Sequence, residues 1–178
     1  IKGDGKVVGA TVLDCETGSL KVVTAKSTVL ATGTYSQIFS PTTVSPFETG
    51  DGHAAAYRVG AELTSMEASQ FVATSIPFPP GTKFLNSLGE EFLPKYGIDN
   101  PRNFAKEPLA YAVWKEITSG RGFKGDNIML DLNNIQEPES CAWFFDNGER
   151  SIKKTRRDPS KGPVASHPKS HTTKGGIV

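Results

Sequence analysis

Alternating and continuous apolar runs predict strands at the start of this chain. The runs Lys6–Asp14 and Leu20–Ala25 are rich in β-branched residues, and Glu16–Ser19 between them has the composition of a hairpin turn. The shorter run Ser27–Thr32 is more apolar and stops at Gly33, as a strand buried on both faces would. The sequence therefore predicts a hairpin followed by a buried strand.

Helical spacing appears after Gly50. Asp51 occupies the position expected for a helix N-cap, and good helix formers continue from Ala54 to Val59 until Gly60 stops them. The first N–H groups of such a helix attract anionic or hydrogen-bonding ligands, and glycine lets a ligand approach the backbone closely. Spacing alone favours the plainer alternative, a capped amphipathic helix packed on a sheet.

A second helix and a further strand are predicted in the second half of the chain. Pro108 suits the first turn of a helix whose apolar stripe runs through Leu109, Ala112 and Val113 and continues with Glu116 and Ile117 before Gly120 ends it. The run Ile128–Leu132 predicts a strand, and residues 149–161 read as a basic, solvated connector.

Composition narrows the function classes. The 178 residues carry 20 basic and 19 acidic side chains and a net charge of +1, and the basic run near residue 155 is diluted by acidic residues without interleaved aromatic residues, which argues against nucleic-acid binding. No apolar run is long enough to cross a bilayer. Cys15 and Cys141 lie far apart without metal-ligand spacing. We therefore expect reduced thiols, no metal site, no direct membrane insertion and a cytoplasmic location.

The order of the motifs resembles the flavoprotein family of succinate dehydrogenase and fumarate reductase, which also includes L-aspartate oxidase. The similarity runs through these segments in family order: "VLATGTYSQIFSPTT", "TGDGHAAAYRVGAEL", "MEASQF", "FLNSLGEEFLPKYG", "AVWKEITSGRGFKGDNIMLDLNNI" and "DPSKGPVASHPKSHTTKGG". The resemblance implies an α/β FAD-binding domain with an inserted α+β capping domain. It divides the chain into a partial FAD-binding domain at 1–72, a capping domain at 73–165 and a return segment at 166–178.

The family's G-x-G-x-x-G motif for the cofactor pyrophosphate does not occur in this sequence. Because this motif is missing, we expect the sequence to be a piece of a longer protein. The piece would lack the first βαβ unit and the last FAD-binding segment. The resemblance implies FAD as the cofactor, a small carboxylate as the substrate and an electron-transfer partner subunit, which would provide any membrane association.

The resemblance also assigns roles to individual residues. Two short segments would contact FAD: Ala31, Thr32 and Gly33 in the first, and Gly50, Asp51 and Gly52 in the second. His171 matches the family histidine that binds a substrate carboxylate. Lys106, followed by Glu107, matches the family's R-D pair, so we expect it in place of the arginine that moves the proton. Asp51 and His171 are expected to face one flavin cavity.

Three departures from the family pattern concern the substrate site. Val72 stands where the Q-F-H-P-T motif has a substrate-binding histidine, the T-E-G-x-R-G-E-G loop is missing between Pro79 and Phe84, and lysine replaces the shuttle arginine. Two hypotheses follow. The parent protein is an FAD-dependent oxidoreductase that transfers hydride between flavin and a substrate other than fumarate, or it keeps the flavin fold as a binding or assembly module without dicarboxylate redox activity.

Overall fold

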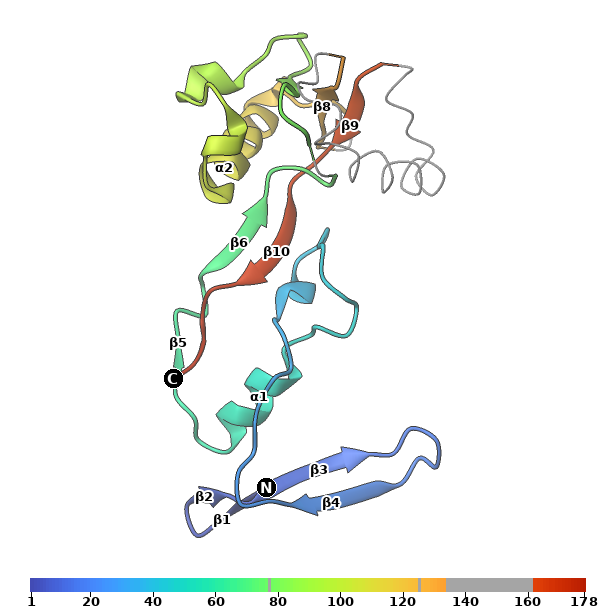
Figure 1. Cartoon of the computed structure of the whole chain (residues 1–178), viewed down its shortest axis with the longest axis vertical. Helices are drawn as coiled ribbons and strands as arrows, with labels where there is room; N and C mark the ends of the chain where they lie inside the picture. Colours follow the sequence, from blue (N-terminus) through green and yellow to red (C-terminus); the bar gives the residue numbers. More distant parts are fainter. Residues whose placement is uncertain (77, 125, 134–161) are drawn as a thin grey trace. The chain divides into compact units, whose positions relative to one another are not determined.

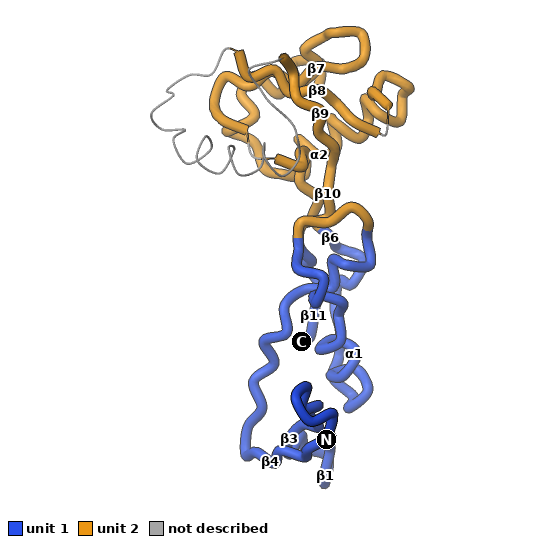
Figure 2. The backbone as a smooth tube through the Cα atoms, turned by 90° about the vertical axis from the view of Figure 1, so that its right-hand side faces the viewer, with its two compact units in different colours: residues 1–39, 44–69, 172–178 blue, residues 40–43, 70–171 orange. Residues whose placement is uncertain are grey.

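The computed structural model describes residues 1–76, 78–124, 126–133 and 162–178. These residues form two compact units, coloured separately in Figure 2. The first unit comprises Ile1–Phe39, Val44–Ser69 and Thr172–Val178, and the second comprises Ser40–Thr43 and Gln70–His171. The expected domain limits after residues 72 and 165 stay predictions.

Short elements make up both units (Figure 1). The first unit contains β1 (Lys2–Gly3), β2 (Lys6–Val7), β3 (Gly9–Leu13), β4 (Leu20–Thr24), η1 (Ser36–Ile38), α1 (Asp51–Arg58), β5 (Leu63–Thr64) and β11 (Gly176–Ile177). The second contains β7 (Lys83–Leu85), η2 (Leu93–Tyr96), η3 (Pro101–Asn103), α2 (Lys106–Glu116), η4 (Ile117–Arg121), β8 (Ile128–Asp131) and β9 (Val164–Ser166). The paired strands β6 (Ser69–Val72) and β10 (Lys169–Thr173) each begin in one unit and end in the other.

The predicted N-terminal hairpin is confirmed. β3 pairs with β4 in antiparallel register from Gly9 opposite Thr24 to Leu13 opposite Leu20. Asp14 Oδ1 shapes the turn by accepting from the backbone N–H groups of Glu16 and Thr17, at 3.0 and 3.2 Å. This is an Asx turn, in which a side-chain oxygen replaces a backbone acceptor.

The predicted buried strand at Ser27–Thr32 is wrong. All six residues are exposed and have no regular secondary structure, and Val29 retains 89% of its accessible surface. A strand requires a neighbour to pair with its backbone groups. Among the described residues, no segment pairs with this one.

The helix α1 begins one residue earlier than predicted. Asp51 is its first residue, and the N-cap is Gly50, whose φ of 87° and ψ of 13° are left-handed and whose position has no side-chain cap. Glycine adopts this conformation without the strain that a Cβ would cause. The Asp51 carboxylate instead accepts a 2.5 Å hydrogen bond from Thr49 Oγ1. The predicted end is confirmed, because α1 stops at Arg58 and Gly60 has a φ of 91°.

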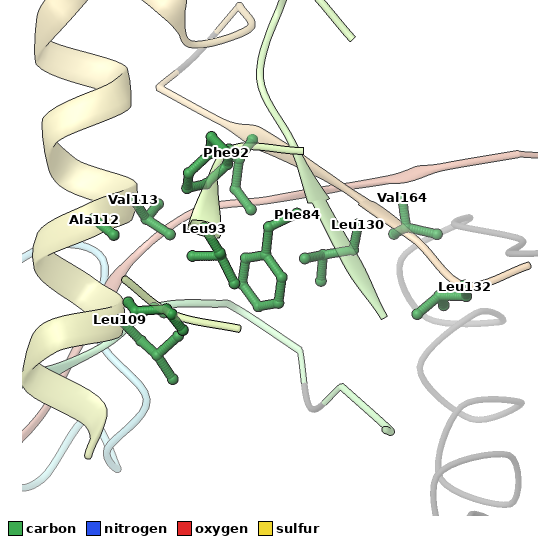
Figure 3. Close-up of a cluster of buried hydrophobic side chains, with 12 residues drawn as sticks. Phe84, Phe92, Leu93, Leu109, Ala112, Val113, Leu130, Leu132 and Val164 are labelled. Atoms are coloured by element: carbon green, nitrogen blue, oxygen red, sulfur yellow. The ribbon is translucent and has the colours of Figure 1, made fainter. Parts of the chain in front are cut away.

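The core of the second unit lies between α2 and the antiparallel sheet β7-β8-β9, as Figure 3 shows. Alternate residues of β8 are buried, which brings Ile128 and Leu130 into the core, and α2 adds Leu109, Ala112 and Val113. Phe84 on β7 packs edge-on against Phe92, with ring centroids 6.4 Å apart. The predicted helix with Pro108 in its first turn and the predicted strand are therefore confirmed.

An ion pair between the buried carboxylate of Glu116 and the partly exposed Arg121 closes the C-terminal end of α2. Arg121 donates to both carboxylate oxygens of Glu116, at 2.7 and 2.9 Å, and Asn86 and Tyr96 donate to them at 3.0 and 2.8 Å. The Glu116 side chain has no exposed surface. The hydrogen bonds from Arg121 are the main reason why the pKa of Glu116 falls to about 2.

Two sequence interpretations lie outside the described residues: the basic connector at 149–161 and the state of Cys141. Cys15 is an exposed free thiol. Within the described ranges, no helix has the length and apolar character that a bilayer-crossing segment needs.

Candidate functional site

The two segments predicted to contact a cofactor meet in the first unit. A Cβ added to Gly52 would lie 1.8 Å from Oγ1 and 2.7 Å from Cβ of Thr32, so only glycine lets α1 approach Ala31–Gly33 this closely. Gly33 has a φ of 74° and lies against Glu48, whose Oε2 accepts from Thr34 N at 3.4 Å.

Exposed groups collect where these segments meet. Ala31, Thr32, Gly33 and Asp51 are exposed, whereas Gly52 is buried beneath them. The first intrahelical bond runs from Ala54 N to Gly50 O, so the N–H groups at the beginning of α1 have no partner within the helix. The segments therefore combine a carboxylate, exposed backbone and the positive end of a helix dipole.

Tyr35 and His53 anchor this arrangement from within the same unit. Tyr35 is buried, its hydroxyl donates to Met66 O at 2.6 Å, and its ring meets the His53 ring at 87° with centroids 5.0 Å apart. A Cβ on Gly50 would lie 2.8 Å from Tyr35 Cβ. The start of α1 thus packs against Tyr35, whose own position is fixed by its hydrogen bond to Met66.

A pocket of about 450 Å³ lies in the second unit. Two residues predicted from the sequence, Lys106 and His171, line it, and so does Val72, at the position where the family has a histidine. The remaining lining residues are Thr43, Ala73, Thr74, Ser75, Ile76, Phe78, Pro101, Arg102, Phe104 and Leu109. Asp51 belongs to the first unit and His171 to the second, so a shared flavin cavity stays a prediction.

Thr43 orients the imidazole of His171. Its Oγ1 lies 2.8 Å from His171 Nδ1 and 3.3 Å from the Ser170 carbonyl oxygen. If the threonine proton goes to that carbonyl, the same oxygen can accept from Nδ1–H of the imidazole. The backbone N–H of Thr43 also donates to Ser170 O, at 2.9 Å, which fixes the segment against β10.

Lys106 is the first residue of α2 and its side chain is exposed in this unit. The neighbouring Glu107 accepts a 2.5 Å hydrogen bond from Gln70 Nε2 on β6. This bond holds the beginning of α2 against the strand that leads to Val72. The helix end that carries Lys106, a residue of the pocket lining, is thereby fixed.

Sequence reasoning missed Arg102. This residue lies in the turn η3, where Asn100 Oδ1 accepts from the Arg102 N–H at 3.0 Å and Pro101 occupies the first position. The Asn-Pro order was a usable signal for a capped turn. Its position at the pocket depends on tertiary structure. In the part of the chain that the structure describes, neither aspartate nor glutamate lines the same pocket.

Comparison with known proteins gives the family. The FAD binding domain family matches residues 1–178. An uncharacterized FAD-dependent oxidoreductase of Methanocaldococcus jannaschii is 32% identical over 98% of this chain and 34% of its own length. The 8-methylmenaquinol:fumarate reductase flavoprotein subunit of Wolinella succinogenes is 29% identical over 98% of this chain and 30% of its own. The chain thus spans about a third of the length of these relatives.

Solved structures agree with this assignment. Mycobacterium smegmatis Sdh1 in complex with UQ1 is similar with a TM-score of 0.76 and 29% identity, over 99% of this chain and 32% of its own. An E. coli quinol fumarate reductase is similar with a TM-score of 0.80 and 26% identity, over 98% of this chain and 34% of its own. The chain belongs to the FAD-binding domain family of the succinate dehydrogenase and fumarate reductase flavoproteins.

Proposed function

We propose that the protein carrying this chain is an FAD-dependent oxidoreductase that acts on a small carboxylate held in the pocket of the second unit. One observation carries the substrate class: among the described residues, the pocket is lined by Arg102, Lys106 and His171 but by no aspartate or glutamate. Such a lining favours an anionic ligand, since the fixed positive charges of arginine and lysine are not neutralised by a carboxylate in the pocket wall.

The first unit has groups that fit FAD. Asp51 accepts hydrogen bonds and carries negative charge, so it suits the hydroxyl and N–H donors of the cofactor better than its phosphates. Ala31, Thr32 and Gly33 offer exposed backbone beside it, and the buried Gly52 keeps the two segments in contact. Bound FAD supplies hydride transfer to or from a substrate carbon.

The residues of the second unit bind the substrate and manage one proton. His171, oriented by Thr43, and Arg102 would donate hydrogen bonds to the substrate carboxylate. Lys106 would hold the proton exchanged with the substrate carbon, because an ammonium group at the end of a fixed helix can reach the pocket and release a proton.

The relatives support two further parts of the proposal. Those from Wolinella succinogenes and Serratia are named as flavoprotein subunits of fumarate reductases, which indicates that this protein also works with an electron-transfer partner subunit. Their substrate is named as fumarate. For this chain, we extend the proposal only to the carboxylate class.

The test uses the FAD-loaded protein that carries these residues, reduced with dithionite without oxygen and mixed with a panel of unsaturated carboxylates. We expect at least one of them to reoxidise the flavin, and we expect Lys106→Met to slow that step by a factor of about 100 or more. Lys115→Met is the matched control on the same helix, because Lys115 is exposed and does not line the pocket.

A reduced protein that no carboxylate reoxidises would contradict the proposal and would favour a binding or assembly module. Equal rates for Lys106→Met and the unchanged protein would remove the proton role of Lys106. Flavin content is measured in each variant, so that loss of cofactor is distinguished from loss of the reaction step.

A further inference from the structure

Apolar side chains form more than half of the pocket wall around His171. Aliphatic residues, a proline and two phenylalanines contribute: Val72, Ala73, Ile76, Phe78, Pro101, Phe104 and Leu109. A wall of this kind stabilises a bound ligand in proportion to the apolar surface of ligand and wall that binding removes from water. The pocket therefore has room for a hydrocarbon portion beside its charged groups.

The hydroxyl groups at the pocket already form hydrogen bonds within the protein. Thr74 Oγ1 donates to Ile76 O at 2.6 Å, and Thr43 Oγ1 contacts both His171 Nδ1 and Ser170 O. The backbone N–H of Ser75 donates to Ser166 Oγ at 2.9 Å, and the Oγ atoms of the two serines lie 3.2 Å apart. A second ligand carboxylate bound at this wall would have to break such bonds, which costs free energy.

Arg102 and His171 can bind one carboxylate. With Lys106 reserved for the proton, Arg102 and His171 remain to bind an anion. A guanidinium can bind both oxygens of a carboxylate at once, and an imidazole adds one donor. This step rests on the proposed function, since it uses the proton role assigned there to Lys106.

We propose that the pocket selects monocarboxylates with an apolar chain over dicarboxylates of the same length. The carboxylate binds Arg102 and His171, and the chain lies along the wall that includes Val72, Ile76 and Phe104. A second carboxylate would lose its hydration at this wall, and the remaining cation among the described lining residues, Lys106, is the group that the proposed function uses for the proton. Val72 is central to this selectivity, because its side chain can neither donate a hydrogen bond nor carry charge.

The test measures binding alone, by isothermal titration calorimetry on the FAD-loaded protein. The ligands are matched pairs of equal chain length, butyrate with succinate and hexanoate with adipate, and octanoate extends the series. We expect the affinity of the monocarboxylates to rise about fourfold for each added methylene. Hexanoate should bind at least about tenfold more tightly than adipate.

Two variants test the assigned residues. Val72→His should tighten adipate binding and weaken hexanoate binding, because it places an imidazole donor in the apolar wall. Arg102→Gln should weaken all five ligands by a factor of about 10 or more. Arg58→Gln is its matched control, since Arg58 is exposed in the last turn of α1 and does not line the pocket.

The outcomes separate this inference from the proposed function. Tighter binding of the dicarboxylate in both pairs, or affinity that does not change with chain length, overturns the selectivity and leaves the carboxylate oxidoreductase intact. Failure of every carboxylate to bind overturns both. Unchanged adipate binding in Val72→His removes the role given to Val72.

Discussion

At the scale of single residues, the environment of Glu116 is the feature that the sequence pattern predicted least well. The helical spacing included it in the stripe that runs through Leu109 and Val113, but spacing cannot show that a carboxylate will be fully buried with Arg121. That pairing depends on Gly120, whose φ of 77° turns the chain so that Arg121 folds back onto α2. Burial of an unpaired charge would be strongly unfavourable, so the residue and its partner are coupled.

We expect Glu116→Gln to lower the free energy of unfolding by about 1.5 to 3 kcal/mol, because hydrogen bonds to a buried carboxylate become hydrogen bonds to a neutral amide while Arg121 stays partly solvated. Glu91→Gln is the matched control, since Glu91 forms only an exposed pair with Lys83 at 3.5 Å and should change stability by less than about 1 kcal/mol. Urea unfolding followed by circular dichroism measures both. Equal stability of the two variants would contradict the structural role of the ion pair.

The same carboxylate predicts a pH dependence. The pKa of Glu116 is about 2 in the folded state and 4.5 ordinarily, so its stabilisation is present above pH 4.5 and is lost as the pH falls towards 2. A shift of this size corresponds to about 3 kcal/mol. Unfolding free energies measured between pH 5 and pH 2 should therefore fall more steeply in the unchanged protein than in Glu116→Gln. Parallel curves would rule out a lowered pKa.

His171 is the residue whose predicted role can be tested most simply by substitution. We expect His171→Gln to weaken carboxylate binding about tenfold, because the shorter-reaching amide does not reproduce the position of the imidazole donor that Thr43 orients. His167→Gln is the control, since His167 is a histidine on the same stretch of chain that does not line this pocket. Unaltered affinity in His171→Gln would exclude His171 from the site.

At the scale of elements, the hydrophobic pattern correctly predicted the helices and strands whose burial depends on residues close to them in sequence. The hairpin β3-β4 has its turn residues between its two strands, and the helix α2 has its apolar stripe within its own length. Both elements lie where they were predicted. The segment Ser27–Thr32 looked like a buried strand because of Val29 and Leu30, but burial needs a paired neighbour and none of the described segments provides one. Likewise, Asp51 had the composition of an N-cap, and only the backbone conformation identifies Gly50 instead.

The contact between α1 and Ala31–Gly33 gives a prediction at this scale. Gly52→Ala should weaken FAD binding about tenfold or more, because the added Cβ would collide with Oγ1, Cβ and Cγ2 of Thr32 and push the segments apart. Helix propensity acts in the opposite direction, since alanine favours a helix by about 1 kcal/mol over glycine. Fluorescence titration of FAD into the apoprotein measures the change.

Ala55→Ser is the control for this change, because it adds an atom at an exposed position of the same helix. Wild-type affinity for FAD in Gly52→Ala would show that the close approach of the two segments does not form part of the cofactor site.

At the scale of the whole molecule, the resemblance to a known family predicted more than the hydrophobic pattern did. Motif order identified the FAD-binding domain family over the full chain, whereas composition and spacing alone left the glycine-flanked helix open to a purely structural interpretation. The pocket brings Lys106 and His171 together although they lie far apart in sequence, and it adds Arg102, which no motif indicated. The proposed substrate site thus depends on the tertiary arrangement of η3, α2 and β10, which no local pattern contains.

The central claim is that this pocket binds the substrate carboxylate. A crystal structure of the FAD-loaded protein with a bound carboxylate tests it most directly. We predict carboxylate oxygens at about 2.7 to 3.2 Å from nitrogen atoms of Arg102 and His171. A carboxylate bound outside the pocket, with both of these side chains turned to solvent, would contradict the account.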